Sequence, residues 1–527
     1  MAETTRETPP GEAPARPAVA WGLVLSLAGA KLLLHLLTTG RFGYGFFVDE
    51  LYFLACAEHL DWGFVDMPPL FPALTALVRA TLGDSLLAVR LVPALCGAAL
   101  VLLAGLLARE MGGGRAAQGL AGLTVVVAPI FLVGHSLHTM NALEPLFVAG
   151  SAFALVRMAS GGSGRWWLLL GPMAALGLLN KHTMALFVLA AVAGVLATRE
   201  RRTLATPWPW VAGALAFALV LPNLLWEIAH GFPHLEQLAN IRADGRDVDL
   251  TAGEFLAQQV LLFHPLAAPL WIGGVAWLLV GREGRRYRAL GVAFLVVLGG
   301  LLLVHGRVYY AAPAFPPVLA AGAVAFERGL RSLPQRWTSA RLAAPAYAGL
   351  LLVTGAVLAP TVLPCLPPET YVRYARALGI DQPRIENHRL GALPQLHADR
   401  FGWPEMVAEV ARVHRSLPEA DRAKAGIFGQ DYGQAGAIDL LGPALGLPKA
   451  LSGHLTYWYW GPRGCTGEVL VVLDDDRETL QRLFRKVELA GHVSHPWSMP
   501  HRQFDVWVCR DPRVPLAALW PRVRKLA

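Results

Sequence analysis

Two adjacent carboxylates, Asp49 and Glu50, have the residue types and the placement that best suit chemistry in this chain of 527 residues. They follow the first long apolar run, Val19–Leu37, and open a stretch whose spacing predicts a short helix over Asp49–Leu60. A carboxylate that loses water at a membrane surface has a raised pKa and can accept a proton as a general base. The alternative is that Asp49 only caps the helix.

Three more polar residues stand at the ends of apolar segments. Asp66 comes directly before Met67-Pro68-Pro69, where it is either a turn residue or a second functional carboxylate. Asn141 and Glu144 are three positions apart near the start of a predicted helix, so they share one side of it. The helix dipole alone favours an acid at this place, but a shared site with Asp49 is the other interpretation.

Lys181 and Arg307 are cations at the ends of predicted spans, and Tyr309 and Tyr310 follow the arginine. Anchoring at the membrane surface is the simpler interpretation, because Arg snorkels and Tyr prefers the interface. Recognition of a lipid phosphate is the functional alternative, because guanidinium and ammonium groups bind phosphate well.

Metal and disulfide chemistry have weaker signals. Asp66 and His264, which opens a later span, are weak candidates for a divalent metal site, since no ligand spacing in the sequence is diagnostic. The five cysteines include no CxxC pair, and Cys465–Cys509 is the one disulfide that we considered.

The elements that position these residues are mostly apolar runs. Hydrophobic residues make up 54% of the chain and charged residues 16%, whereas soluble proteins carry about 25% charged residues. Runs long enough to span a bilayer occur at 19–37, 86–108, 117–134, 142–157, 166–180, 183–198, 208–226, 257–280, 289–305, 309–326 and 343–363. The sequence therefore predicts a multi-pass α-helical membrane protein with about 11 transmembrane helices.

Arginine-rich loops alternate with arginine-poor loops along the chain, which predicts the orientation of the spans. We expect a disordered cytoplasmic tail at 1–17 and a transmembrane domain at 18–363 in the plasma (inner) membrane. Its two long outer loops are 39–84 and 227–256. The formal net charge of +8 sits mostly in the inner loops, so a nucleic-acid partner is not expected.

Residues 364–527 are predicted to form a small extracytoplasmic α/β domain. Its predicted helices are Trp403–Ser416, Gly436–Leu441 and Arg477–Ala490, and its predicted strands are Ala425–Phe428, Glu468–Leu473 and Phe504–Cys509. The aromatic run Tyr457–Trp460 is best explained as a partly buried strand, although such rings also stack on sugars or lie on membranes. Asp474–Asp476 are explained as a helix cap.

Taken together, several motifs resemble bacterial membrane glycosyltransferases of the GT-C fold, of the protein O-mannosyltransferase and lipid A aminoarabinose transferase type. The Asp49-Glu50 pair is the most specific part of this resemblance. The motifs are Val48–Phe53, Asp61–Leu70, Asp84-Ser85 with Arg90-Leu91, Thr139–Phe147, Gly177–His182, Leu221–Trp226, Arg307–Tyr310 with Pro316-Pro317, and Gln430–Ala437 with Trp460–Pro462.

The resemblance implies a sugar donor on a polyprenyl phosphate, such as undecaprenyl phosphate, and a hydroxyl on a lipid, glycan or protein as acceptor. It implies inversion at the anomeric carbon, with Asp49 as general base and Glu50 orienting the site. Lys181 and Arg307 are the candidates that stabilise the leaving phosphate. The remaining substrate-binding candidates are Asp66, Asn141, Glu144, Tyr309 and Tyr310. No cofactor is predicted beyond an optional divalent metal.

The chain departs from this family pattern at two positions. Met67 stands where the aminoarabinose transferases have a lysine before Pro-Pro, so another residue must serve the lipid phosphate. Asn141 stands where many relatives have aspartate, and Glu144, one turn later, can take the acidic role.

Two other function classes remain as alternatives. A membrane transporter or lipid-linked sugar flippase would place ionisable residues within its spans, whereas here Lys31 is the exception in nearly uncharged runs. A non-catalytic glycan-binding membrane protein would use the aromatic run at 457–460, but it leaves the polar residues of several loops unexplained.

Overall fold

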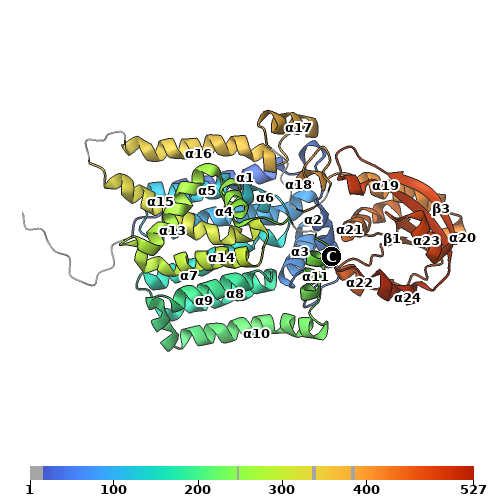
Figure 1. Cartoon of the computed structure of the whole chain (residues 1–527), viewed down its shortest axis with the longest axis horizontal. Helices are drawn as coiled ribbons and strands as arrows, with labels where there is room; N and C mark the ends of the chain where they lie inside the picture. Colours follow the sequence, from blue (N-terminus) through green and yellow to red (C-terminus); the bar gives the residue numbers. More distant parts are fainter. Residues whose placement is uncertain (1–15, 246–247, 335–339, 381–385, 388) are drawn as a thin grey trace, which may run out of the picture.

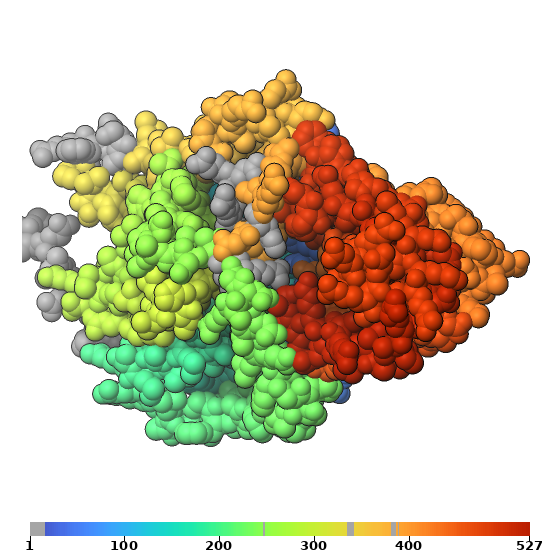
Figure 2. All heavy atoms as spheres, turned by 45° about the vertical axis from the view of Figure 1, so that its right-hand side comes forward, coloured from blue at the N-terminus to red at the C-terminus, as the bar shows by residue number. Residues whose placement is uncertain are grey.

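A helical bundle and a smaller region that contains a sheet lie end to end along the long axis of the molecule (Figure 1). The computed structural model describes residues 16–245, 248–334, 340–380, 386–387 and 389–527. Most of the predicted tail at 1–17, and two residues of the predicted loop 227–256, therefore lie outside the described residues. Figure 2 shows the C-terminal region (red) seated against one end of the bundle.

Seven helices of the described chain are long and apolar enough to cross a membrane. They lie in α1 (Trp21–Thr38), α4 (Leu86–Glu110), α7 (Glu144–Ala159), α10 (Trp208–Ala229), α14 (Arg288–Leu303), α15 (Phe315–Arg331) and α16 (Ala340–Val362). The pair α12 (Ala252–Leu262) and α13 (Ala268–Val280) adds an eighth if it counts as one span. The chain is therefore a multi-pass helical membrane protein with seven or eight candidate spans, where the apolar runs alone predicted eleven.

The difference in the number of spans comes from breaks and short helices. The short ones are α5 (Arg115–Val127), α6 (Pro129–Gly134), α8 (Trp167–Asn180) and α9 (Met184–Leu196). Pro129 cannot continue α5, and the buried Lys31 Nζ donates to the freed carbonyl oxygen of Val125 at 3.2 Å. The predicted span 257–280 is bent by 98° at His264, whose φ of +78° takes the backbone out of the helical region.

Three short helices lie between the bundle and the C-terminal region: α2 (Val48–Cys56), α3 (Leu70–Leu82) and α11 (Pro233–Ala243). The sequence predicted α2 within a few residues, because its apolar spacing has the helical period. The helices α2 and α3 share one apolar core with the C-terminal region, in which Leu51 is fully buried.

The C-terminal region is built around a four-stranded mixed sheet with strand order β1-β2-β4-β3. Its strands are β1 (Ala425–Phe428), β2 (Val469–Leu473), β3 (Phe484–Val493) and β4 (Phe504–Pro512). Its helices are α17 (Pro368–Ala377), α18 (Gln395–Ala398), α19 (Trp403–Ser416), α20 (Glu419–Arg422), α21 (Tyr432–Leu441), α22 (Thr456–Tyr459), α23 (Arg477–Leu483) and α24 (Leu516–Leu519). The strands β1 and β2 are parallel and are connected through α21, whereas β4 is antiparallel to both of its neighbours.

Two predictions for this region are wrong, and the structure also answers the disulfide question that the sequence left open. The predicted helix Arg477–Ala490 ends at Leu483, because the residues that follow pair with β4 instead. The aromatic run at 457–460 is not a strand but falls in and after the helical turn α22. Cys465 and Cys509 are both free thiols, so the disulfide does not form.

Candidate active site

The helix α2 brings the two adjacent carboxylates to the end of the bundle that faces the C-terminal region. Asp49 and Glu50 both lie in its first turn, where the helix dipole favours negative charge. The capping residue is Phe47, whose backbone N–H donates to Glu50 Oε2 at 2.8 Å. The interpretation of Asp49 as a helix cap is therefore wrong, and its side chain is left for other contacts.

Glu50 is fully buried and joins α2 to the bundle. The guanidinium of Arg90, on α4, donates to Glu50 Oε1 at 2.9 Å and to Oε2 at 2.7 Å. The backbone N–H of His138 also donates to Oε1, at 2.8 Å. Burial alone would raise the pKa of Glu50, but Arg90 and these donors together lower it. Both oxygens of Glu50 are thus engaged by the protein, which suits a residue that holds α2 in place.

Asp49 and Asp66 each accept a hydrogen bond from a tyrosine. The hydroxyl of Tyr432, on α21, donates to Asp49 Oδ1 at 2.8 Å, and that of Tyr52 donates to Asp66 Oδ1 at 2.7 Å. Burial, with a smaller contribution from the negative charge of Asp49, raises the pKa of Asp66 to about 7. The structure therefore brings together two carboxylates that the sequence places 17 positions apart.

A second group of predicted residues gathers around Lys181. Its Nζ donates to Asn141 Oδ1 at 2.7 Å and lies 3.5 Å from Glu144 Oε2. The same ammonium lies 4.4 Å from the ring centre of Tyr310 and 5.7 Å from that of Tyr309. Lys181 and Glu144 are mostly buried, so this cation is held by one carboxylate, one amide and two aromatic faces.

His234, on α11, connects the two groups. Burial lowers its pKa and the charge of Lys181 lowers it further, while the nearby backbone of Val65 opposes this shift. Val65 directly precedes Asp66, and the ring of His182 stacks on His234 with centres 4.3 Å apart. The Asp49–Asp66 pair and the Lys181 group are therefore two sides of one site.

Two predicted residues have partners elsewhere in the chain. Arg307 Nη2 lies 3.1 Å from Glu386 Oε1, so this guanidinium pairs with a carboxylate of the C-terminal region. His264 is buried at the bend between α12 and α13, where its Nδ1 accepts from the Leu266 N–H at 3.2 Å. The structure does not join it to Asp66, and no three metal-ligating side chains cluster among the described residues.

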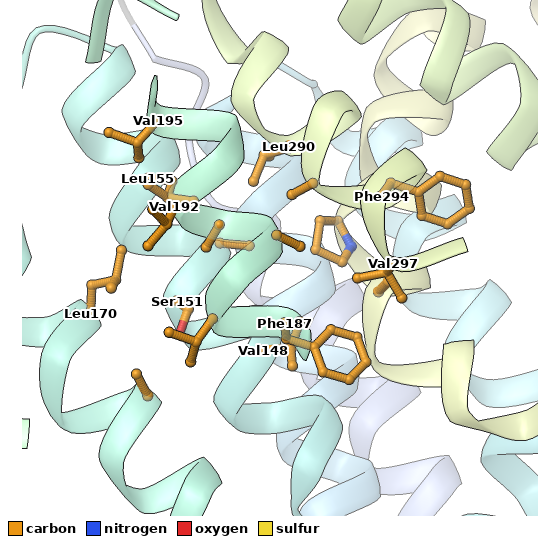
Figure 3. A pocket seen from close by; sticks show the side chains of 18 of the residues that line it. Val148, Ser151, Leu155, Leu170, Phe187, Val192, Val195, Leu290, Phe294 and Val297 are labelled. Atoms are coloured by element: carbon orange, nitrogen blue, oxygen red, sulfur yellow. The ribbon is translucent and has the colours of Figure 1, made fainter. Parts of the chain in front are cut away.

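An apolar cavity of about 70 Å³ lies inside the bundle next to the Lys181 group (Figure 3). It is lined from α7, α8, α9, α14 and α15, and Ser151 adds a single hydroxyl to an otherwise apolar wall. Val148 stands one turn after Glu144, and Met184 three positions after Lys181, so the cavity begins where the polar group ends. Such a wall accepts hydrocarbon and excludes water.

Sequence reasoning missed several residues that shape the site. Tyr432, Tyr52, Arg90 and His234 were not singled out for it, because each acts through a contact with a distant segment. Tyr432 stands in the Gln430–Ala437 motif of the family resemblance, and that motif was the one signal that marked its neighbourhood.

The chain is similar to known proteins in part of its sequence and in its fold. Residues 66–226 match the model of the family described as dolichyl-phosphate-mannose-protein mannosyltransferase, a range that includes Asp66, Asn141, Glu144 and Lys181. No curated protein matches the sequence. The fold is similar to that of ArnT from Cupriavidus metallidurans, solved bound to undecaprenyl phosphate (16% identity, TM-score 0.59) and in the apo state (15% identity, TM-score 0.60). Each comparison covers 93% of this chain and 98% of that chain.

Proposed function

We propose that this chain is a polyprenyl-phosphate-sugar-dependent membrane glycosyltransferase of the family it matches. It moves the sugar from the polyprenyl phosphate to an acceptor hydroxyl and inverts the configuration at the anomeric carbon. The observation that carries the proposal is the meeting of an acidic pair and a buried lysine beside an apolar cavity. Such a transfer needs a carboxylate that acts as general base, a cation that stabilises the leaving phosphate and an apolar surface that binds the polyprenyl chain.

In this reaction the acceptor hydroxyl gives its proton to Asp49, and its oxygen bonds to the anomeric carbon. The bond from that carbon to the phosphate oxygen breaks, and the polyprenyl phosphate leaves with the electron pair. Asp49 suits the base because Oδ1 is held by Tyr432 and the carboxylate remains partly accessible. Glu50 fixes the helix that carries it.

The leaving phosphate gains negative charge as the bond breaks, and Lys181 is the cation that we assign to it. Its ammonium is already positioned by Asn141 and Glu144, so little reorganisation is needed when the donor binds. Tyr309 and Tyr310 border the same ammonium, and the apolar cavity takes the first part of the polyprenyl chain. Asp66 faces the acceptor side with Asp49.

We place the site at the outer face of the plasma membrane, because the arginine-rich loops lie at the other ends of the spans. A carrier lipid then enters sideways from the bilayer, and a lipid, glycan or protein acceptor reaches the site from beneath the C-terminal region. The domain boundaries 18–363 and 364–527 belong to the same proposal. No role is assigned to a divalent metal in this proposal.

The test is transfer by purified protein in vesicles that contain a radiolabelled undecaprenyl-phosphate-linked sugar and a membrane extract as source of acceptors. We expect release of the lipid phosphate coupled to a labelled product, and loss of both in Asp49→Asn by at least about a hundredfold. Asp84→Asn is the matched control, because Asp84 pairs with Arg79 away from the site. Full activity of Asp49→Asn would remove Asp49 from its role as base.

A further inference from the structure

The C-terminal region approaches α2 more closely than side chains would allow, because glycines stand at the contact. A Cβ added to Gly436, on α21, would lie 2.8 Å from the backbone of Leu51, and one added to Gly433 would lie 2.5 Å from Val48. Val48 and Leu51 are on α2, where they flank Asp49 and Glu50 in the sequence. The two helices thus meet almost backbone to backbone, which gives α21 a fixed position relative to Asp49.

The first residue of α21, Tyr432, is held by the helix cap that precedes it and by two neighbouring rings. The side chain of Asp431 caps the helix by accepting from the Gln434 N–H at 2.8 Å. The Tyr432 ring lies between those of Tyr52 and His454, with centre distances of 4.9 and 5.0 Å. Its hydroxyl therefore reaches Asp49 from a rigid platform, and the short Tyr432–Asp49 distance of 2.8 Å is set by packing.

We propose that Tyr432 is a positioning residue for Asp49, so that the C-terminal region completes the catalytic site. The inference rests on the proposed role of Asp49 as base. A hydroxyl that donates to Oδ1 stabilises the ionised carboxylate and fixes its rotation. The fixed rotation sets how the Asp49 carboxylate meets the acceptor, on the same side as Asp66.

A second contact from the same region supports this assignment. Thr456, at the start of α22, lies 2.7 Å from the Tyr52 hydroxyl through its Oγ1 and accepts from the Val65 N–H at 3.1 Å. Tyr52 in turn donates to Asp66. The C-terminal region therefore orients both carboxylates, Asp49 directly and Asp66 through Tyr52.

The test is Tyr432→Phe, which removes one hydroxyl and keeps the packed ring. We expect kcat to fall about tenfold with the KM for the donor within about twofold, because the hydroxyl touches the base and not the donor. The variant also removes a hydrogen bond that stabilises the charged form of Asp49. The acidic limb of the pH profile of kcat should therefore shift to a pH about one unit higher. Tyr374→Phe is the matched control, because the Tyr374 hydroxyl donates to the Val357 carbonyl outside the site.

The outcomes separate this inference from the function on which it rests. Loss of transfer in Asp49→Asn together with an unchanged Tyr432→Phe overturns the role of Tyr432 and keeps the base. A lower kcat with an unmoved acidic limb also overturns it, because lost packing would give that result. A faster Tyr432→Phe would mean that the tyrosine blocks Asp49. Full activity of Asp49→Asn removes the premise itself.

Discussion

At the scale of single residues, the pKa values of Glu50 and Asp66 are shifted in opposite directions. Glu50, beside Asp49, is stabilised as an anion by Arg90, while burial raises the pKa of Asp66 to about 7. The protein thus holds one acid charged through a salt bridge and lets another titrate near neutrality. Groups with separated pKa values are typical of acid–base sites.

The raised pKa of Asp66 has a cost in stability that grows with pH. The folded protein binds a proton at Asp66 up to about pH 7, whereas the unfolded chain releases it near the ordinary value of 3.8. The free energy of unfolding therefore falls as the pH rises between these values. Asp66→Asn, which keeps an oxygen for Tyr52, should raise Tm relative to the natural chain. The gain should increase from pH 5 to pH 7 and level off above; a gain that is the same at every pH would contradict the assignment.

At the scale of elements, the contact of α2 with α21 decides where the acids lie. The helices are short, but Leu51 is fully buried and Val48 nearly so, and the covering surface comes from the C-terminal region. Apolar burial of this kind stabilises by roughly 25 cal/mol per Å². The placement of Asp49 is therefore a consequence of packing between distant segments.

Gly436→Ala should disturb this contact specifically. The new Cβ would lie 2.8 Å from the Leu51 backbone, so α21 must shift, at a cost of about 1–3 kcal/mol. We expect a lower Tm and a lower kcat. Gly349→Ala, in α16 with nothing near its added Cβ, is the control and should be neutral or stabilising. Equal effects of both changes on kcat would argue against the close contact.

The sequence predicted elements wherever the signal is local. The helix Trp403–Ser416 was predicted with the bounds that the structure has, because helical spacing of apolar residues is visible within the segment. The strand Phe484–Val493 was missed, because its conformation depends on pairing with β4. The same holds for the site: Asp49 and Asp66 stand out in the sequence, whereas Tyr432 acquires its role only when α21 docks.

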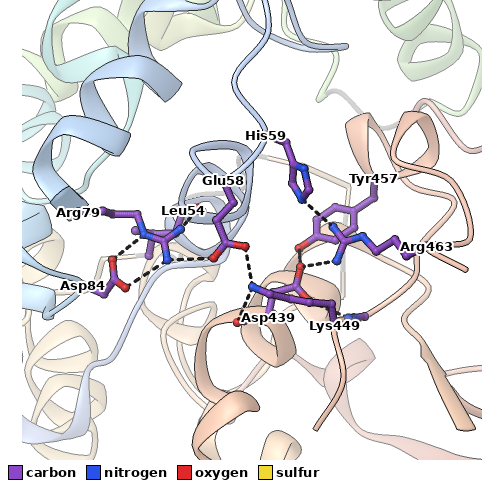
Figure 4. Close-up of polar contacts among 10 residues, drawn as sticks. Leu54, Glu58, His59, Arg79, Asp84, Asp439, Lys449, Tyr457 and Arg463 are labelled. Atoms are coloured by element: carbon purple, nitrogen blue, oxygen red, sulfur yellow. Dashed lines mark hydrogen bonds and ion pairs between the residues drawn. The ribbon is translucent and has the colours of Figure 1, made fainter.

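At the scale of the whole molecule, the bundle and the C-terminal region share an apolar core and an ion-pair network. Figure 4 shows Glu58 between Arg79 and Lys449, with N–O distances of 2.9 and 2.6 Å, and Arg463 bound to Asp439 at 3.1 Å. The two pairs of Glu58 are partly exposed, and ion pairs of this kind contribute about 1 kcal/mol or less and are screened by salt. Salt does not screen the apolar contacts of the shared core.

Docking of the C-terminal region should therefore withstand salt. We expect the amide protons of α2 to exchange with deuterium equally slowly in about 0.1 M and 1 M NaCl. Lys449→Met should shift Tm by only a few degrees, because it removes a single partly exposed pair. Rapid exchange of α2 at high salt would show instead that the ion pairs hold the two parts together.

The Tyr432–Asp49 hydrogen bond also has a consequence for the synthesis of the protein. The two residues are 383 positions apart in the chain. A ribosome that adds about 5–20 residues per second needs roughly 20–80 s between them. During that interval Asp49 lacks its hydrogen bond from Tyr432, and α2 is not yet covered by the C-terminal region. Under the proposed function, transfer activity should therefore appear only after the C-terminal region has been made. A chain that stops before this region but retains every span should show no transfer activity.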